Sequence, residues 1–189
     1  MNITDIYYLI NGKRYTRVSA VLSYCSRDYD RVPEHYMEEA RALGQQIHSY
    51  FDFINKELSF EIPEHLQNHI HNYDSWLHAN VAKVIGSEMI VRSDKYRFAG
   101  RADLVAMIND TDLALIDIKT TAGKLKSHKA QTAAYTMALK EMGYNIRRRM
   151  ILYIDKNTGE VNPIKLTSIQ HDTNGWQSAL SWYRYNKAA

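Results

Sequence analysis

A short apolar segment that ends in alternating charged residues constrains the fold of this chain most. Leu113–Ile116 is apolar throughout, which is typical of a strand buried on both faces, and Asp117, Ile118 and Lys119 follow at once. Because strand side chains alternate, Asp117 and Lys119 should share a face. An acid and a base at the end of a buried strand are costly to desolvate unless they pair or bind a metal. Taken alone, the pattern fits either a strand-end ion pair or a reactive site.

The preceding strand pattern, Tyr96–Ile108, contains a second acid. Asp103 lies within its apolar run, and Gly100 marks a bulge or a close approach of another group. The short link after this segment predicts that it pairs with the next strand as a hairpin, which would bring Asp103 within reach of Asp117. Two nearby carboxylates repel each other, and a hard divalent cation relieves that repulsion. The two strands therefore predict a site of oxygen ligands that suits Mg²⁺ and leaves positions for a phosphate and a water.

Two further side chains fall where they could join this site. Glu88 lies in an apolar strand pattern, Val84–Arg92, and His48 follows Gly44 by one turn on a long helix that opens at Pro33. A glycine inside a helix costs about 1 kcal/mol against alanine, so it should permit close packing. The alternatives are a surface charge on an edge strand for Glu88 and a satisfied core histidine for His48.

The helix predicted at 127–142 has a polar face and a basic start. Gln131 and Tyr135 are four residues apart and therefore share a face, from which they could contact the site, a phosphate backbone or only solvent. Four basic residues precede or open this helix, and they could hold phosphates or form a solvated helix end: Lys124, Lys126, His128 and Lys129.

The remaining pattern predicts an α/β domain with a mixed β-sheet flanked by helices. A hairpin turns at Asn11-Gly12, and two helices precede the strands just described. We expect one domain, 1–189, with a hairpin and helical part, 1–82, and a sheet core with a C-terminal helix, 83–189. Further strands are expected at 148–155 and 160–166, and the last helix at about 173–185.

Composition permits a nucleic-acid partner without requiring one, because the net charge is only +3. Tyrosine is frequent, with 14 residues, and the N-terminal region mixes it with arginine. That region could clamp single-stranded DNA by stacking and charge or form a packed cap. Its basic and aromatic residues are Arg14, Arg17, Arg27, Arg31, Tyr7, Tyr8, Tyr15, Tyr24 and Tyr29.

Three other features bear on the class of protein. The only cysteine, Cys25, cannot form a disulfide within the chain and is expected to be a small buried residue. With no apolar run of membrane-spanning length and no signal-peptide pattern, we expect a cytoplasmic protein without membrane contact. Arg147, Arg148 and Arg149 alternate in direction along a strand, so we interpret them as residues that aid solubility.

Taken in order, these motifs resemble those of RecB-like nucleases in the PD-(D/E)XK superfamily. The resemblance covers about half of the chain, Gly44 to Tyr135. It rests on Gly44-x-x-x-His48, Glu88, Gly100-x-x-Asp103, Asp117-x-Lys119 and Gln131-x-x-x-Tyr135. The start, Tyr15–Ser19, also looks like that of small phage and mitochondrial exonucleases of this group. Members with an iron–sulfur cluster use four cysteines, so this chain is not expected to carry one.

The resemblance implies a restriction-endonuclease-like core and roles for individual residues. His48, Asp103, Asp117 and the Ile118 carbonyl would bind Mg²⁺ or Mn²⁺, with Glu88 in support. Lys119 would orient or help deprotonate the attacking water and stabilise developing charge. Gln131 and Tyr135 would position DNA or the metal-binding groups, and Lys124, Lys126 and Lys129 would contact the DNA backbone.

The function implied is a metal-dependent DNA nuclease, an exonuclease in DNA end processing, recombination or repair, of a kind common in phages. Its partner would be DNA, single-stranded or with ends, and a recombinase, a helicase or a single-strand-binding protein are candidate protein partners. The alternatives are a structure- or sequence-specific endonuclease on the same fold, a non-catalytic DNA-binding module, and a metal-dependent hydrolase of another substrate class.

Overall fold

The computed structural model describes residues 2–3, 6–25, 34–108, 111–120 and 126–187, with side chains from residue 6 onward except those of 34–37. Eight strands form one mixed sheet: β1 (Asn2–Ile3), β2 (Tyr7–Ile10), β3 (Lys13–Arg17), β4 (Lys83–Ser93), β5 (Phe98–Ile108), β6 (Asp112–Lys119), β7 (Arg148–Ile154) and β8 (Val161–Leu166). The helices are α1 (Val18–Cys25), α2 (Glu34–Asn55), a short 3₁₀ turn (Glu64–Leu66), α3 (Gln67–Asn80), α4 (Lys126–Glu141) and α5 (Ile169–Lys187).

The expected α/β architecture is confirmed, and helix ends account for most of the differences. Helix α2 ends at Asn55 rather than near residue 58, and α5 begins at Ile169 rather than near residue 173. The Asn11-Gly12 turn is present, and both residues have positive φ, 50° and 73°. This left-handed backbone suits Asn and Gly in a tight hairpin turn.

Strand β5 organises the sheet because both of its edges are used. Strand β4 pairs antiparallel along one edge, from Phe98 to Met107 of β5. Along the opposite edge, β3 pairs parallel with residues 98–99 of β5, and β6 pairs antiparallel with residues 104–108 of β5. Between these two partners, residues 100–103 of β5 pair with no strand of the described chain on that edge. The N-terminal hairpin, expected as a cap, therefore extends the sheet through β3.

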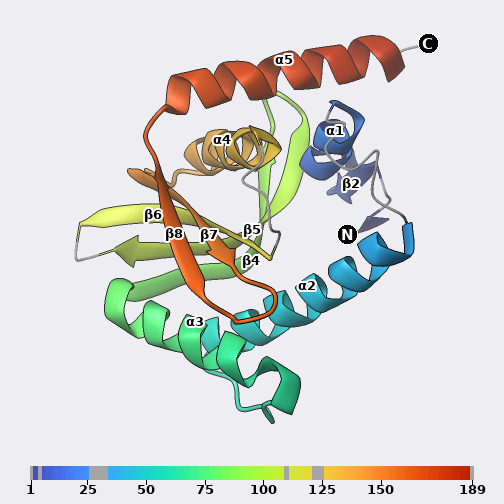
Figure 1. Ribbon diagram of the computed structural model, residues 1–189. Coiled ribbons are helices and arrows are strands. Elements are labelled where there is room, and N and C mark those ends of the chain that lie inside the picture. The colour runs from blue at the N-terminus through green and yellow to red at the C-terminus, as the bar shows by residue number, and fades with distance from the viewer. Residues whose placement is uncertain (1, 4–5, 26–33, 109–110, 121–125, 188–189) are drawn as a thin grey trace.

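Helices cover both faces of the sheet, as Figure 1 shows. Helices α1, α4 and α5 pack on one face, where Val105, Leu115 and Trp176 belong to the same buried cluster. Helices α2 and α3 pack on the other, where Ile47 and Phe51 contact a cluster that includes Ile116. Burial of these apolar faces supplies the main driving force for the fold. No helix in the described ranges is both long and apolar enough to cross a membrane.

Two expectations about individual residues were wrong. Arg149 is buried, and its guanidinium donates to Asp172 Oδ2 at 2.8 Å, which ties β7 to α5. A solubilising role for it is therefore excluded, because a charge this buried requires a partner. Cys25 is exposed rather than buried.

Candidate active site

Glu88 and Asp103 lie opposite each other on neighbouring strands. Ser87 pairs with Leu104 and Met89 with Ala102, so Glu88 faces Asp103 on the rung between them. An irregularity between Val84 and Gly86 shifts the register by one residue and produces this match. Such a bulge can redirect side chains next to an active site.

The backbone departs from regular strand geometry at this rung. Glu88 has φ of 51°, a left-handed conformation that is uncommon for a residue other than Gly, Asn or Asp. As a result, Ser87 and Glu88 both reach α2, Ser87 through Asn55 and Glu88 through His48. Backbone strain of this kind costs on the order of 1–3 kcal/mol and clusters at functional sites.

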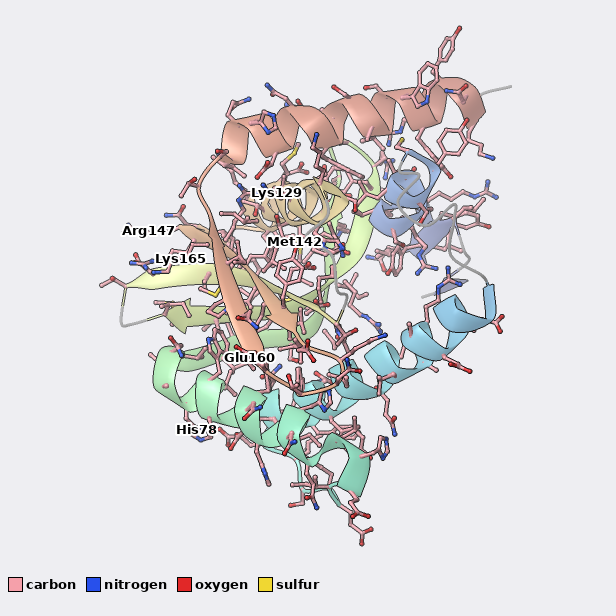
Figure 2. The ribbon with its side chains drawn as sticks, viewed as in Figure 1. His78, Lys129, Met142, Arg147, Glu160 and Lys165 are labelled. Atoms are coloured by element: carbon pink, nitrogen blue, oxygen red, sulfur yellow. The ribbon has the colours of Figure 1, made fainter. Side chains whose placement is uncertain are left out.

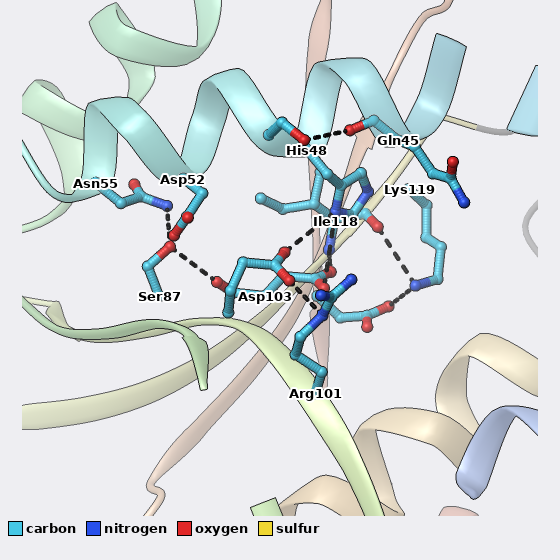
Figure 3. Close-up of polar contacts among 12 residues, drawn as sticks. Gln45, His48, Asp52, Asn55, Ser87, Arg101, Asp103, Ile118 and Lys119 are labelled. Carbon is cyan, nitrogen blue, oxygen red and sulfur yellow. Dashed lines mark hydrogen bonds and ion pairs between the residues drawn. The ribbon is translucent and has the colours of Figure 1, made fainter. Parts of the chain in front are cut away.

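Gly44 explains how α2 approaches the ends of the strands. A Cβ built on Gly44 would lie 2.8 Å from Thr120 Oγ1, directly after β6. The glycine thus lets α2 pack closely there, as its position in the sequence predicted. One turn later, His48 lies over the Glu88–Asp103 rung (Figure 3).

His48, Glu88 and Asp103 form a compact group of candidate metal ligands. His48 Nδ1 lies 3.8 Å from Glu88 Oε1 and 3.7 Å from Asp103 Oδ1. One ligand atom from each residue falls within 4.8 Å of the others. Burial by itself lowers the pKa of His48, but Asp103 and the hydrogen bond with Glu88 outweigh it and raise that pKa. The group therefore already attracts a cation.

Asp103 also binds the backbone of the next strand. The β5–β6 ladder ends at Leu104 and Ile116, and beyond that end the Ile118 N–H donates to Asp103 Oδ2 at 2.6 Å. The predicted pairing of these strands is thus confirmed, but Asp103 and Asp117 lie beyond the end of the ladder, where the charge of Asp103 adds to the rise in the pKa of Asp117.

Asp117 and Lys119 form a buried ion pair beside this group. Lys119 Nζ lies 2.7 Å from Asp117 Oδ2 and donates to the Ile118 carbonyl at 3.3 Å. Burial raises the pKa of Asp117 to about 6; Asp103 adds to the rise, and Lys119 and His48 oppose it. Burial by itself lowers the pKa of Lys119, but the carboxylates of Asp117 and Asp103 outweigh it and raise that pKa. Lys119 therefore stays an ammonium in this arrangement.

Gly100 provides space for an aromatic ring beneath the acids. A Cβ built on Gly100 would lie 2.3 Å from Tyr135 Cε1. The Tyr135 hydroxyl accepts a hydrogen bond from Gln131 at 3.1 Å, and the ring is buried. Burial raises the pKa of Tyr135, and the charges of Asp117 and Asp103 add to the rise. The close approach predicted at Gly100 is thus made by α4.

A chain of hydrogen bonds that the sequence did not reveal supports Asp103 from the α2 side. Tyr73 Oη donates to Asn55 Oδ1 at 2.8 Å. Asn55 Nδ2 donates to Ser87 Oγ at 3.1 Å, and Ser87 Oγ donates to the Asp103 carbonyl at 3.4 Å (Figure 3). The only available signal was the polar position of Asn55 on an apolar helix face.

Comparison with known proteins identifies the family of this chain. The model of the PD-(D/E)XK nuclease superfamily matches residues 20–188. The chain belongs to this superfamily. No curated protein sequence matches significantly.

Solved structures show what this superfamily member resembles in fold. A candidate exonuclease from Eubacterium rectale superposes with a TM-score of 0.51 at 17% identity, over 100% of this chain and 85% of that chain. An alkaline exonuclease from Laribacter hongkongensis has a TM-score of 0.38 at 15% identity, over 92% and 93% of the two chains.

The basic residues expected to contact DNA in this PD-(D/E)XK nuclease differ in their surroundings. Lys126 and Lys129 are exposed on the first turn of α4. Lys124 lies outside the described residues. His128 is buried against Tyr153, with 3.1 Å between its Nδ1 and the hydroxyl, which removes it from the set that could hold a phosphate.

The N-terminal tyrosines divide into buried and exposed groups. Tyr8 and Tyr15 are buried with Ala99, so they pack the hairpin against the sheet rather than stack on bases. Tyr24 is exposed and makes an edge contact with Tyr183. Arg27, Arg31 and Tyr29 lie outside the described residues.

The donor set of this PD-(D/E)XK site fits a divalent cation. Two carboxylates and an imidazole nitrogen converge, a combination that suits Mn²⁺ or Mg²⁺. Asp117 Oδ1 is buried and has no hydrogen-bond partner among the described residues. A buried, unpaired carboxylate oxygen is costly without a cation. The Lys119 ammonium already bridges Asp117 and the Ile118 carbonyl, which shows that both oxygens face a position that favours positive charge.

Proposed function

We propose that this PD-(D/E)XK superfamily member is a divalent-metal-dependent deoxyribonuclease that acts from DNA ends. The observation that carries the proposal is the convergence of His48, Glu88 and Asp103 beside the buried Asp117–Lys119 pair. The candidate exonuclease of the same fold supports the choice of an exonuclease. A protein that only binds DNA has no need of buried carboxylates, which repel phosphate.

The residues divide the chemistry between them. His48, Glu88 and Asp103 would hold the cation, with Asp117 and the Ile118 carbonyl adjoining. A bound Mg²⁺ or Mn²⁺ supplies a polarised phosphoryl group and an activated water. Lys119, paired with Asp117 beside this group, would orient or help deprotonate the attacking water and stabilise developing negative charge.

The remaining residues act through these groups or on the substrate. Tyr135, buried on Gly100, holds the sheet edge beneath the acids and does not contact DNA. Gln131 fixes the Tyr135 hydroxyl. Lys126 and Lys129, which are exposed, would contact backbone phosphates.

The test uses end-labelled single-stranded, double-stranded and closed circular DNA with Mg²⁺, Mn²⁺ or chelator. We expect metal-dependent release of nucleotides from linear DNA, with closed circles intact. Asp117→Ala and Lys119→Ala should each abolish it, whereas Glu160→Gln, an exposed acid after β7 (Figure 2), should not.

Three outcomes would contradict the proposal. Cleavage of closed circles would favour the endonuclease. Metal-independent DNA binding with no cleavage would favour a binding module. Unchanged activity in both site variants would overturn the assignment of the site.

A further inference from the structure

A second polar site lies on the same face of the sheet as the acid group. It is a cavity of about 260 Å³ where the β2–β3 turn meets the β4–β5 turn. Its lining contains three cationic side chains and one acidic side chain. The residues are Asn11, Lys13, Tyr15, Arg92, Asp94 and Arg97.

The acid in this cavity is already neutralised by its neighbours. Tyr15 donates a hydrogen bond to Asp94 Oδ1, and Arg92 Nε lies 3.5 Å from Asp94 Oδ2. The Arg97 guanidinium lies 5.5 Å from the Tyr15 ring centroid. Among the described residues, no carboxylate oxygen lies within 4 Å of the Lys13 or Arg97 nitrogens. The positive charge of Lys13 also helps to lower the pKa of Asp94, so three cations face one carboxylate and the cavity keeps a surplus of positive charge for an anion from outside.

The sheet register connects this cavity to the acids. From the Glu88–Asp103 rung, the next positions on the same face are Ile90 with Arg101 and then Arg92 with Ala99. Ile90 and Ala99 pack with Tyr15, which confirms that this face also carries the cavity.

This strip of the sheet suits a polyanion. Arg101 is exposed midway along it, where its Nε pairs with Glu88 Oε2, and no acid of β4 or β5 lies between that pair and the cavity. Four to six strand residues at about 3.3 Å each give roughly 13–20 Å between the acid group and the cavity. A strand with B-form geometry spans that distance with about four to six nucleotides.

We propose that the cavity of Lys13, Arg92 and Arg97 binds a backbone phosphate of the nucleic-acid strand whose scissile bond lies at the His48, Glu88 and Asp103 group. This inference rests on the proposed function, because the contact of the strand with the acid group follows from that function. The cavity is not expected to recognise the DNA sequence, because its cationic groups suit a phosphate rather than the edge of a base. It fixes the position of the strand several nucleotides from the cut and thereby raises affinity for substrates long enough to reach it.

The test compares Lys13→Gln/Arg97→Gln with Arg147→Gln/Lys165→Gln. Each pair removes one exposed lysine and one exposed arginine, and the control residues, directly before β7 and in β8, are labelled in Figure 2. Binding of fluorescent oligonucleotides of 3 and 20 nucleotides is measured by anisotropy in chelator, and KM and kcat are measured with metal. Thermal unfolding confirms that both variants fold.

We expect the cavity variant to weaken binding of the long oligonucleotide by roughly ten-fold and to reduce its salt dependence by about one phosphate contact. KM for the long substrate should rise with kcat unchanged, and the short oligonucleotide should not distinguish the variants. Equal losses in the cavity and control variants would overturn the proposal.

Chemical substitution of the substrate provides a test that changes no residue. A neutral methylphosphonate is moved along the 20-nucleotide strand. Wild-type protein should lose affinity at one internal position, several nucleotides from the cut, and the cavity variant should lose none there. A flat profile in wild-type protein would overturn the proposal. If no cleavage occurs with any metal, the proposed nuclease function fails, and the anisotropy measurements alone decide whether the cavity binds phosphate.

Discussion

The backbone N–H of Ile118 donates to Asp103 Oδ2 at 2.6 Å, which gives Asp103 two tasks. One carboxylate oxygen holds the end of β6 in place, and the other faces His48. A residue expected only as a metal ligand thus also replaces a ladder hydrogen bond where β5 and β6 separate.

The two tasks of Asp103 can be separated by substitution. Asp103→Asn keeps an oxygen that accepts from Ile118, so we expect its unfolding free energy to stay within about 1 kcal/mol of wild type. Removal of the charge should still reduce activity at least about 100-fold. Asp103→Ala leaves the buried N–H unpaired and should cost a further 1–3 kcal/mol or so. Urea unfolding and amide exchange at Ile118 check this; equal stability of the two variants would contradict it.

Metal binding should weaken as the pH falls. Asp117, with a pKa of about 6, and His48, with a raised pKa, must both lose protons before they can bind a cation. At a fixed, subsaturating Mn²⁺ concentration, activity should therefore decline towards pH 6 and below. More metal should move the midpoint to lower pH. Titration of Mn²⁺ binding by calorimetry from pH 5 to 8 checks the sign, and an affinity that rises with acidity would refute it.

Gly100 and Tyr135 should be energetically coupled. Gly100→Ala places a methyl group against the Tyr135 ring, 2.3 Å from Cε1, so we expect a destabilisation of about 1–3 kcal/mol. In the Tyr135→Leu background the same substitution should cost much less, because the ring is gone. A double-mutant cycle by urea unfolding measures the coupling. Additive effects would show that the two residues do not constrain each other.

The positive φ at Glu88 predicts that two variants without the carboxylate differ in stability. Asn tolerates positive φ and Gln does not, so Glu88→Asn should be more stable than Glu88→Gln by about 1 kcal/mol. Both variants lose the carboxylate and should lose most of their activity. Thermal unfolding and the nuclease assay give the comparison; a Gln variant as stable as the Asn variant would argue against strain at this position.

The order of elements could be read from the sequence because the signals are local. The apolar run before Asp117 defines a buried strand, and alternation alone places Asp117 and Lys119 side by side, which the 2.7 Å contact confirms. Asn11-Gly12 defines its turn in the same way. Gly44 and Gly100 could be identified as points of close approach, but their partners could not, because Thr120 and Tyr135 lie in other elements.

What the sequence by itself determined is the set of strands and helices and the positions of the acids along them, since these depend on alternation, helical spacing and turn residues. The tertiary structure alone decided that β4 shifts register near Ile85, that Glu88 adopts positive φ opposite Asp103, and that α2 brings His48 to both. It also placed Lys13 beside Arg97 and buried Arg149 on Asp172. These features arise from packing between distant segments, where the energy of many contacts outweighs the preference of any one residue.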